Sequence, residues 1–411
     1  MRILNPTAYY EPEQVSSSHI AKNRNDAFIN AGFDLRIVTP TPSRGLDDNT
    51  IKEYAKRNKE VLEGGHITVY RIPLFKEKGN SLFRTLRYVI GGIKQLRFCV
   101  KNGKDCDVIL AASTPPFMGA LCGRMKKKLG IPFIYNLQDI FPDSLVGTGL
   151  SKKNSILWKI GRKIEDYTYL QADKIIVISQ DFKRNIMAKG VPEEKIEVIY
   201  NWVDQNAVVD IPRQENKLFD KYSLDRSKFY VTYNGNIGLT QNMDMLLEVA
   251  KALEANEDIH FVLVGNGAYL EEVKSIIAER GIGNVTLLPF QPYEDISHVF
   301  SLGDVSLVIS KSGVGENSVP SKTWSIMSAS RPVLANFDEN ELKTIIEDHH
   351  CGIFTKAGDK VAFTDAILKL YHDRELCKEL GRNGRQFVLD NLTKEVGTQK
   401  YVDVIKSFEK K

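Results

Sequence analysis

Hydrophobic residues follow two alternating patterns along the 411-residue chain. Short runs of β-branched and aromatic residues predict buried strands, and apolar residues three or four positions apart predict helices between them, most clearly over 20–31 and 156–172. In the first half the predicted strands are residues 1–4, 34–40, 67–73, 107–113, 132–139, 174–179 and 195–201. In the second half they are residues 229–235, 260–267, 285–290, 304–310, 332–337 and 351–356.

This order of elements predicts the fold class and the domains. Strands that alternate with helices form parallel sheets covered on both faces, so we expect an α/β protein with two doubly wound, Rossmann-like domains. The length of the chain also favours two domains. We place a first domain at 1–204, a polar linker without clear period at 205–228, a second domain at 229–390, and a C-terminal helix at 391–411 that packs back on the first domain.

Composition excludes several classes of protein. No apolar run approaches the roughly 18 residues of a membrane-spanning helix, and the first residues lack the apolar core of a signal peptide, so we expect a cytoplasmic protein. No pair of cysteines forms a C-x-x-C motif, which argues against a disulfide framework or a zinc site and suggests small core residues. These cysteines are Cys99, Cys106, Cys122, Cys351 and Cys377.

Charge divides the chain into two unlike halves. The net charge is only +4, but residues 1–200 hold 32 Lys and Arg against 21 Asp and Glu, and residues 201–411 hold 24 against 31. The first half therefore carries +11 and the second −7. This asymmetry suggests that the first half faces an anionic surface, and we expect that surface to be a membrane and not a nucleic acid.

The segment 76–104 has the pattern of a basic amphipathic helix. Its apolar residues recur at helical spacing, and its only acid is Glu77. Its cations are Lys76, Lys78, Arg84, Arg87, Lys94, Arg97, Lys101 and Lys104. Such a helix can lie in the interface of an anionic membrane. The alternative is that its apolar side packs on the first sheet and its basic side is merely solvated.

A glycine-bearing turn follows the first strand of the second half. The strand ends at Gly235-Asn236-Ile237-Gly238, and a helical period begins at Met243. Ligands of open parallel sheets lie beyond the carboxyl ends of the strands, where glycines allow close approach and a helix N-terminus attracts anions. A phosphate is the natural ligand here, although many such turns are only tight connections.

A second polar loop follows the predicted strand 304–310. Gly313 and Gly315 precede the run Glu316-Asn317-Ser318, and Ser321 and Lys322 then open a predicted helix. A cation at a helix N-terminus opposes the helix dipole, which suggests that an anion lies nearby. The alternative is a solvated surface lysine. Two smaller candidates at the same edge, each also explicable as a turn, are Gly265-Asn266-Gly267 and Phe290.

Several of these stretches together resemble glycosyltransferase family four, whose members have the two-domain GT-B fold. The resemblance runs nearly end to end, through residues 172–204, 233–247, 261–273, 285–308 and 319–334. The stretch 136–150, NLQDIFPDSLVGTGL, is similar to the branch that includes L-fucosamine transferases of bacterial surface-polysaccharide synthesis.

The resemblance implies a hexosyltransferase-type enzyme for capsule, O-antigen or exopolysaccharide synthesis. A nucleotide sugar, expected to be a UDP-sugar, would bind the second domain, and a lipid-linked glycan acceptor would bind the first, with a cleft between them. Transfer would retain the anomeric configuration and need no metal and no further cofactor. The protein would then work peripherally on the inner face of the cytoplasmic membrane. No acidic D-x-D pair lies in a loop at the end of a predicted strand, which fits metal independence, so side chains and backbone N–H groups would neutralise the diphosphate.

Site residues follow from the same resemblance. Catalytic candidates are Lys322, Glu316 and Asp139. Candidates for the donor diphosphate are Gly235, Asn236, Ile237, Gly238, Gln241 and Lys322, and candidates for the donor sugar are Glu316, Asn317, Ser318 and Val319. Candidates for the nucleoside are Gly265, Asn266, Phe290 and Ser325, and candidates for the acceptor are Ser17, Ser18, His19 and Asn136. Asp139 would orient or deprotonate an acceptor hydroxyl, unless it is only a turn aspartate, and His19 is explained as well by helix capping.

The sequence also departs from the family. Relatives commonly carry Arg and Lys where this chain has Asn236 or Ile237 and Gln241. Two family glutamates fall on Asn317 and Ser325, so a role for Glu316 needs a shift of one residue. These departures keep two alternatives open, a sugar-nucleotide epimerase with the same architecture and a non-catalytic donor-binding subunit.

Overall fold

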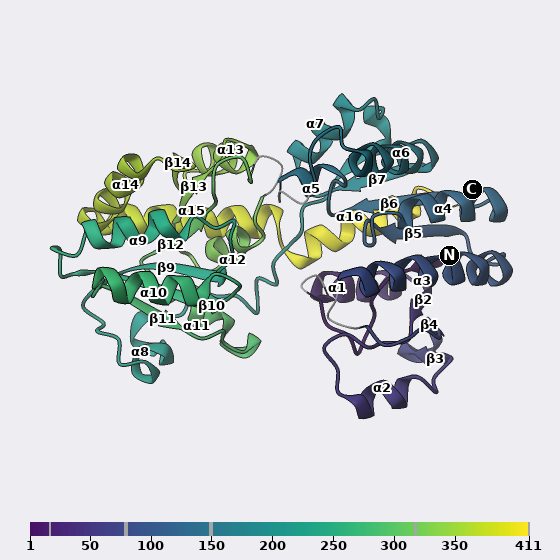
Figure 1. Ribbon diagram of the computed structural model, residues 1–411, viewed down its shortest axis with the longest axis horizontal. Coiled ribbons are helices and arrows are strands. Elements are labelled where there is room, and N and C mark those ends of the chain that lie inside the picture. The colour runs from purple at the N-terminus through teal and green to yellow at the C-terminus, as the bar shows by residue number, and fades with distance from the viewer. Residues whose placement is uncertain (16–17, 78–80, 148–150, 316–318, 410–411) are drawn as a thin grey trace. The chain divides into compact units, whose positions relative to one another are not determined.

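The computed structural model describes residues 1–15, 18–77, 81–147, 151–315 and 319–409. The chain divides into two compact units, here called unit 1 (residues 1–200 and 397–411) and unit 2 (residues 201–396). Each unit is a parallel sheet with helices on its faces (Figure 1). The predicted fold class, two doubly wound α/β domains, is confirmed.

Unit 1 is built on a sheet of eight strands in the order β3-β4-β2-β1-β5-β6-β7-β8. The strands are β1 (Arg2–Pro6), β2 (Asp34–Pro40), β3 (Lys59–Leu62), β4 (Ile67–Ile72), β5 (Val108–Ala112), β6 (Phe133–Leu137), β7 (Lys174–Val177) and β8 (Ile196–Val198). Neighbouring strands pair in parallel, except that β3 runs antiparallel to β4 at the edge. The pattern of hydrophobic residues did not predict β3.

The helices of unit 1 fill the connections between these strands. They are α1 (Ser18–Asn30), α2 (Asp48–Tyr54), α3 (Ser81–Asn102), α4 (Met118–Leu129), α5 (Asp143–Gly147), α6 (Ile156–Gln171) and α7 (Gln180–Ala188), with short 3-10 turns at η1 (Glu63–Gly65) and η2 (Glu193–Lys195). The core between the sheet and α3, α4 and α6 includes fully buried Phe133, Cys122 and Met125. All five cysteines of the chain are buried, as the sequence predicts.

Unit 2 has a six-stranded parallel sheet in the order β11-β10-β9-β12-β13-β14. Its strands are β9 (Phe229–Asn236), β10 (Ile259–Asn266), β11 (Val285–Leu288), β12 (Val305–Ile309), β13 (Val333–Phe337) and β14 (Gly352–Lys356). Its helices are α8 (Lys217–Lys221), α9 (Met243–Ala252), α10 (Leu270–Arg280), α11 (Ile296–Phe300), α12 (Lys322–Ser328), α13 (Glu341–Asp348), α14 (Lys360–His372), α15 (Arg374–Asn391) and the start of α16 (Lys394–Lys406), with η3 (Arg213–Glu215) and η4 (Tyr293–Asp295).

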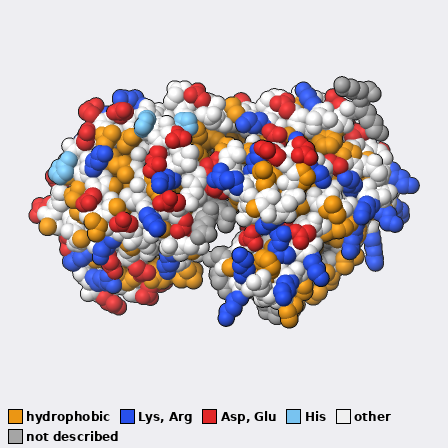
Figure 2. All heavy atoms as spheres, turned by 90° about the horizontal axis from the view of Figure 1, so that it is seen from above, with side chains coloured by type: hydrophobic (Ala, Val, Ile, Leu, Met, Phe, Trp, Pro, Cys, Tyr) orange, Lys and Arg blue, Asp and Glu red, His pale blue; other side chains and the backbone are white. Residues whose placement is uncertain are grey.

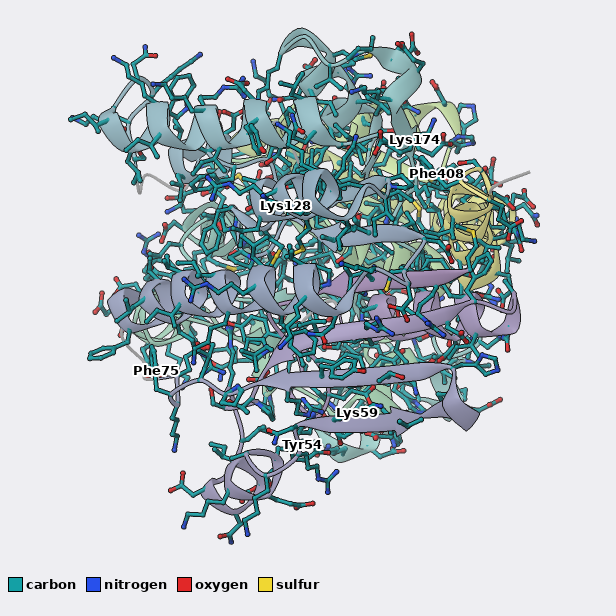
Figure 3. All side chains as sticks on the ribbon, turned by 90° about the vertical axis from the view of Figure 1, so that its right-hand side faces the viewer. Tyr54, Lys59, Phe75, Lys128, Lys174 and Phe408 are labelled. Carbon is teal, nitrogen blue, oxygen red and sulfur yellow. The ribbon has the colours of Figure 1, made fainter. Side chains whose placement is uncertain are left out.

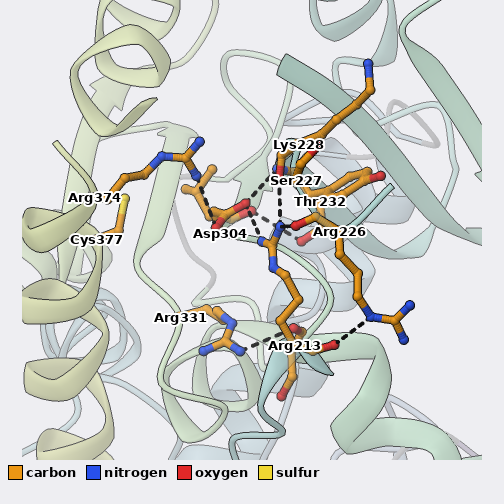
Figure 4. Close-up of polar contacts among 12 residues, drawn as sticks. Arg213, Arg226, Ser227, Lys228, Thr232, Asp304, Arg331, Arg374 and Cys377 are labelled. Atoms are coloured by element: carbon orange, nitrogen blue, oxygen red, sulfur yellow. Dashed lines mark hydrogen bonds and ion pairs between the residues drawn. The ribbon is translucent and has the colours of Figure 1, made fainter. Parts of the chain in front are cut away.

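Residues 205–228, expected to be a linker, pack as part of unit 2. Leu218 and Phe219 on α8 are fully buried. Asp304 accepts hydrogen bonds from the Arg213 side chain at 2.6 Å and from the Tyr230 N–H at 2.8 Å (Figure 4). Because this carboxylate joins the segment to β9 and β12, the segment cannot move independently of the sheet.

Helix α16 continues from unit 2 into unit 1, which includes residues 397–411. In unit 1 the buried Tyr401 hydroxyl donates to the Asn136 side-chain oxygen at 3.0 Å. Arg24 of α1 lies 5.9 Å from the centre of the Tyr401 ring. Burial raises the pKa of Tyr401 to about 12, so the phenol stays protonated and remains a donor. The C-terminal helix is thus fastened to the carboxyl end of β6.

Across the described residues, we find no helix that combines the length and the apolar composition needed to cross a bilayer.

Candidate functional site

The carboxyl ends of β9 and β10 approach each other closely in unit 2. Gly235 pairs with Gly265 and has a φ of +132°, a conformation that favours glycine. A Cβ atom on Gly265 would lie only 1.9 Å from the Gly235 carbonyl oxygen, and one on Gly267 would lie 2.2 Å from the Ile237 oxygen. Gly265 and Gly267 are therefore required by backbone packing.

The turn after β9 is held by its own hydrogen bonds. The Ile237 N–H donates to the Asn266 carbonyl at 2.9 Å, and the Ile237 side chain is fully buried. The Gly238 N–H donates to the Gln241 side-chain oxygen at 3.1 Å. Two N–H groups that we expected to meet a diphosphate are thus already bonded. Contact through Gly238 would require the Gln241 amide to move aside.

Lys322 is the first residue of α12 and extends toward this turn. Its Nζ lies 3.8 Å from the centre of the Tyr233 ring and 3.2 Å from the position of a Cβ on Gly235. The side chain keeps some access to solvent, but the protein atoms crowded around it lower the pKa of its ammonium to about 7. Among the described residues it has no hydrogen-bond or ion-pair partner, and the Ser321 hydroxyl makes no capping bond.

A lysine crowded by protein without a counter-ion is destabilised in its charged form. An anion placed beside Gly235 would remove that penalty, because it would supply the missing partner. The ring of Tyr233 already gives the cation a weak attraction, and the Tyr233 hydroxyl is held by the Asn236 carbonyl at 2.7 Å. The arrangement is suited to receive a negatively charged group.

Other buried polar atoms near the same edge also lack protein partners within the described residues. They are both side-chain amide atoms of Asn234 on β9, the Ser310 hydroxyl after β12, and the Thr323 hydroxyl on α12. Buried polar groups are nearly always hydrogen-bonded, so a set of unsatisfied ones near this edge of the sheet suggests a bound ligand or water. The sequence did not single out these three residues, because each lies in or next to an apolar run.

The loop after β12 is anchored from the end of β13. Asp338, which the sequence did not indicate, accepts hydrogen bonds from the N–H groups of Gly313 at 2.9 Å and Gly315 at 2.7 Å. The predicted donor-sugar residues Glu316, Asn317 and Ser318 lie outside the described residues. Val319 and Ser325 are described, and both side chains are partly exposed.

The predicted nucleoside residues lie at the ends of β10 and β11. The exposed Asn266 side chain accepts a hydrogen bond from the Gly267 N–H at 2.7 Å. The Phe290 side chain is 75% exposed, whereas the core phenylalanines of unit 2, such as Phe229 and Phe261, are fully buried. An exposed ring is available to stack against a flat group, and uncovered apolar area of this size gains from being covered.

The acceptor candidates lie in unit 1 and have different surroundings. Asn136 is buried and its side-chain oxygen also accepts from Gln138 at 2.8 Å, so it is occupied within the protein. Ser18 accepts from the Val15 N–H at 2.8 Å, and His19 is exposed on the first turn of α1. Ser17 lies outside the described residues.

Asp139 follows the end of β6 and accepts a hydrogen bond from Ser144 at 3.1 Å. Its side chain is open to solvent, yet nearby protein removes part of its hydration and raises the pKa of the carboxyl group, against the lowering effect of Ser144. A carboxylate with a raised pKa is a better proton acceptor, which agrees with a role toward a hydroxyl.

Metal ligands were also sought. Within the described ranges, His, Cys, Asp and Glu side chains form no group of three or more that could hold a metal ion. The predicted metal independence remains a prediction.

Two family models match adjacent parts of the chain. The model described as Glycosyltransferase Family 4 matches residues 24–207, and the model described as Glycosyl transferases group 1 matches residues 214–387. The first lies almost wholly in unit 1 and the second in unit 2. Both descriptions name transferases, which favours that reading over the sugar-nucleotide epimerase.

Curated relatives carry related names. A Pseudomonas aeruginosa protein named as the glycosyltransferase WbjE is 25% identical over 92% of this chain and 88% of its own length. The Escherichia coli K12 protein WcaI, named as a glycosyl transferase of colanic acid biosynthesis, is 25% identical over 80% of this chain and 81% of its own. Among solved structures, Anabaena HepE in complex with UDP-glucose matches 99% of this chain and 100% of its own with a TM-score of 0.71 and 16% identity. This structural match supports the fold alone, which is the GT-B arrangement of two Rossmann-like domains.

Proposed function

Because the chain is a glycosyltransferase with the GT-B fold, we propose that it moves a sugar from a UDP-sugar to a lipid-linked glycan during synthesis of a bacterial surface polysaccharide. The observation that carries the proposal is the crowded ammonium of Lys322 beside Gly235, which has no hydrogen-bond or ion-pair partner among the described residues. The names of the relatives support polysaccharide synthesis, and colanic acid is one such polymer. UDP is favoured as the nucleotide because HepE binds UDP-glucose.

In the proposed reaction, the bond between the sugar's anomeric carbon and the diphosphate oxygen breaks, and a bond to the acceptor oxygen forms. Lys322 stabilises the charge that develops on the leaving diphosphate, where a positioned cation is most effective. Asp139 orients the acceptor hydroxyl or takes its proton, and Glu316 contacts the donor sugar. The anomeric configuration is retained, as the resemblance to family four implies.

Location and specificity are part of the same proposal. We place the enzyme peripherally on the inner face of the cytoplasmic membrane, because a lipid-linked acceptor is met there. The sequence of residues 136–150, of which the structure describes 136–147, supports assignment to the L-fucosamine transferase branch. The reaction is proposed to need no metal and no cofactor besides the donor.

The proposal is tested by thermal shift with a panel of UDP-, GDP-, dTDP- and CMP-sugars, because a ligand that binds the folded state raises its midpoint. We expect a UDP-sugar to give the largest shift and to be hydrolysed slowly without acceptor. A larger shift with another base would refute the choice of UDP. Tight binding with no hydrolysis and no transfer to lipid-extract acceptors would refute catalysis and favour a donor-binding subunit.

A further inference from the structure

Two helices of unit 1 expose large apolar side chains on their outer surfaces. On α3 the exposed residues are Phe83, Leu86, Val89 and Ile93, and on the first turns of α6 they are Ile156, Leu157 and Ile160. Exposure reaches 79% for Ile156 and 49% for Leu86. Single exposed apolar residues are ordinary, but contiguous sets on soluble proteins mark interaction surfaces.

Both sets belong to one layer. Helices α3, α4 and α6 lie side by side on the same face of the sheet, with α4 in the middle (Figure 3). Each of the three helices connects two parallel strands and therefore runs antiparallel to them. Helices α3 and α6 thus begin at the same edge of the sheet, on the side where Phe75 is labelled (Figure 3). The exposed apolar residues on the first turns of both helices are therefore at one end of this layer.

Helix α4 packs closely against both neighbours because small residues line the contacts. A Cβ atom on Gly119 would lie 2.2 Å from the Thr168 side chain of α6, and one on Gly92 of α3 would lie 2.6 Å from Leu121. Residues 118–123 of α4 are buried or nearly so. The exposed apolar residues of α3 and α6 thus form two ridges, one on each side of α4, and the surface of the three helices is here called the α3–α6 face.

Exposed cations lie on the same helices, beside the α6 ridge and on the later turns of α3 and α4. Figure 2 shows hydrophobic side chains next to Lys and Arg along the lower and right margins of the half that carries α6. Exposed cations on and beside the three helices are Lys94, Arg97, Lys101, Arg124, Lys127, Lys128, Lys152, Lys153, Lys159 and Lys163. Asp166 is an exposed acid on the same layer, and it is paired with Arg162.

One expected cation is not part of this surface. The Arg87 side chain is buried and donates to the backbone carbonyls of Phe75 and Thr41. Arg84 is half-exposed and lies 3.1 Å from the carboxylate of Glu77. The exposed positive charge of α3 therefore lies on its later turns, at Lys94, Arg97 and Lys101, and not on its first turns as the sequence suggests.

We propose that the α3–α6 face docks unit 1 on an anionic lipid bilayer, with the apolar ridges of both helices entering the interface and the surrounding cations meeting the headgroups. An apolar surface with cations around it matches a membrane of phospholipid anions better than a second copy of this chain, whose own face would present the same charge. The inference rests on the proposed function in one respect: docking would bring the enzyme to its lipid-linked acceptor. It adds α6 as a second anchor, and two parallel ridges fix the rotation of unit 1 on the bilayer where one helix would not.

The test is co-sedimentation of the full-length protein with vesicles of 70% phosphatidylcholine and 30% phosphatidylglycerol at low salt. We expect binding to fall on raising salt and to be at least tenfold weaker on pure phosphatidylcholine, because headgroup charge attracts each cation. Replacing Ile156, Leu157 and Ile160 with Ser should lower the partition coefficient at least tenfold. The same change at Leu86, Val89 and Ile93 should do likewise.

A matched pair of single variants separates this face from general stickiness. Ile156→Ser removes a residue that is 79% exposed at the start of α6, and Leu170→Ser removes one that is 71% exposed at the other end of the same helix. We expect roughly fivefold weaker binding for the first, since about half of its burial energy is lost, and no change for the second. Equal effects of the two variants would overturn the proposed face.

For charge, Lys159→Gln with Lys163→Gln should weaken binding on the order of tenfold, whereas Lys274→Gln with Lys378→Gln on unit 2 should not. Loss of binding in the α3 variants alone would overturn the role of α6. If wild-type protein stays in the supernatant while it still hydrolyses a nucleotide sugar, the face and the proposed membrane location are wrong, and the proposed use of a nucleotide-sugar donor stands. Concentration-dependent dimers abolished by the Ser variants would instead identify a second copy as the occupant.

Discussion

Replacing Lys322 with Ala is expected to slow sugar transfer on the order of 10²- to 10³-fold while unit 2 stays folded. The Lys322 Nζ lies 3.2 Å from the position of a Cβ on Gly235, so an anion above that glycine would come within about 4 Å of the ammonium. At that separation a pair of unit charges near a protein surface gains about 4 kcal/mol. With a pKa of about 7, roughly half of the molecules are uncharged at neutral pH, which reduces the gain by about 0.4 kcal/mol.

The remaining gain of about 3.6 kcal/mol matches what a positioned charge contributes to a transition state. The assay is the turnover number with the nucleotide sugar that gives the largest thermal shift, measured first as hydrolysis and then as transfer. The matched control is Lys356→Ala, which removes an exposed lysine at the end of β14 on the same edge of the sheet. We expect that control to keep its full rate.

Two measurements separate loss of chemistry from loss of structure. Removal of a crowded charge that has no partner within the described part of unit 2 should leave the thermal midpoint unchanged or raise it, because the folded protein no longer holds a poorly solvated ammonium. A turnover number for Lys322→Ala within threefold of the wild type, with the midpoint preserved, would refute the assignment of Lys322 to the leaving group.

Four further outcomes are expected. The folded-state pKa of Lys322 lies below its unfolded value, so the unfolded chain holds more protons than the folded one above pH 7. The free energy of unfolding should therefore rise between about pH 7 and pH 10, and this rise should be absent in Lys322→Met. For the same reason UDP should bind with proton uptake above pH 7, its Kd rising by up to tenfold per pH unit, as titration calorimetry in buffers of different ionisation heat can measure. Transfer should persist in excess EDTA, and a loss that magnesium restores would show that a metal is needed. Gly265→Ala should cost at least about 3 kcal/mol in urea unfolding because its Cβ would meet the Gly235 oxygen at 1.9 Å, whereas Gly283→Ala meets only the flexible end of Glu254 at 3.3 Å and should cost under about 1 kcal/mol.

The parts of the fold that local pattern could predict are the buried ones. Every parallel strand of both sheets coincides with a β-branched or aromatic run, because a strand covered on both faces must be apolar along its length. The hydrophobic pattern does not predict strand β3, Lys59–Leu62, because this strand is short and mostly exposed at an edge of the sheet. The sequence of residues 205–228 is typical of a linker because it has no clear period. The segment is held in place by a contact with the distant Asp304, which no local pattern can encode.

The candidate site was predictable only where chemistry departs from the apolar pattern. Gly235 and Lys322 were found because a glycine after a strand and a lysine at a helix start are unusual there. Tyr233 and Asn234 were missed because both look like core positions of an apolar strand. The structure places the Tyr233 ring against the Lys322 ammonium and leaves the buried Asn234 amide without a partner among the described residues. Asp338 was missed for another reason, since an aspartate after a strand most often ends a turn and its two glycine partners lie more than twenty residues earlier.

Helix α3 shows why a helical period does not by itself assign the two sides of a helix. Its spacing allows the apolar residues to face the sheet and the arginines to face solvent, and the structure reverses this at its first turns. Arg87 is buried and donates hydrogen bonds to two backbone carbonyls, and these bonds offset much of the cost of desolvating a guanidinium. Leu86 and Ile93 are then left in water, an arrangement that gains nothing for the isolated unit. Their exposure is therefore best explained by a surface that covers them, and α6, with an exposed apolar ridge starting at the same edge, extends that surface beyond what any single helix of the sequence indicates.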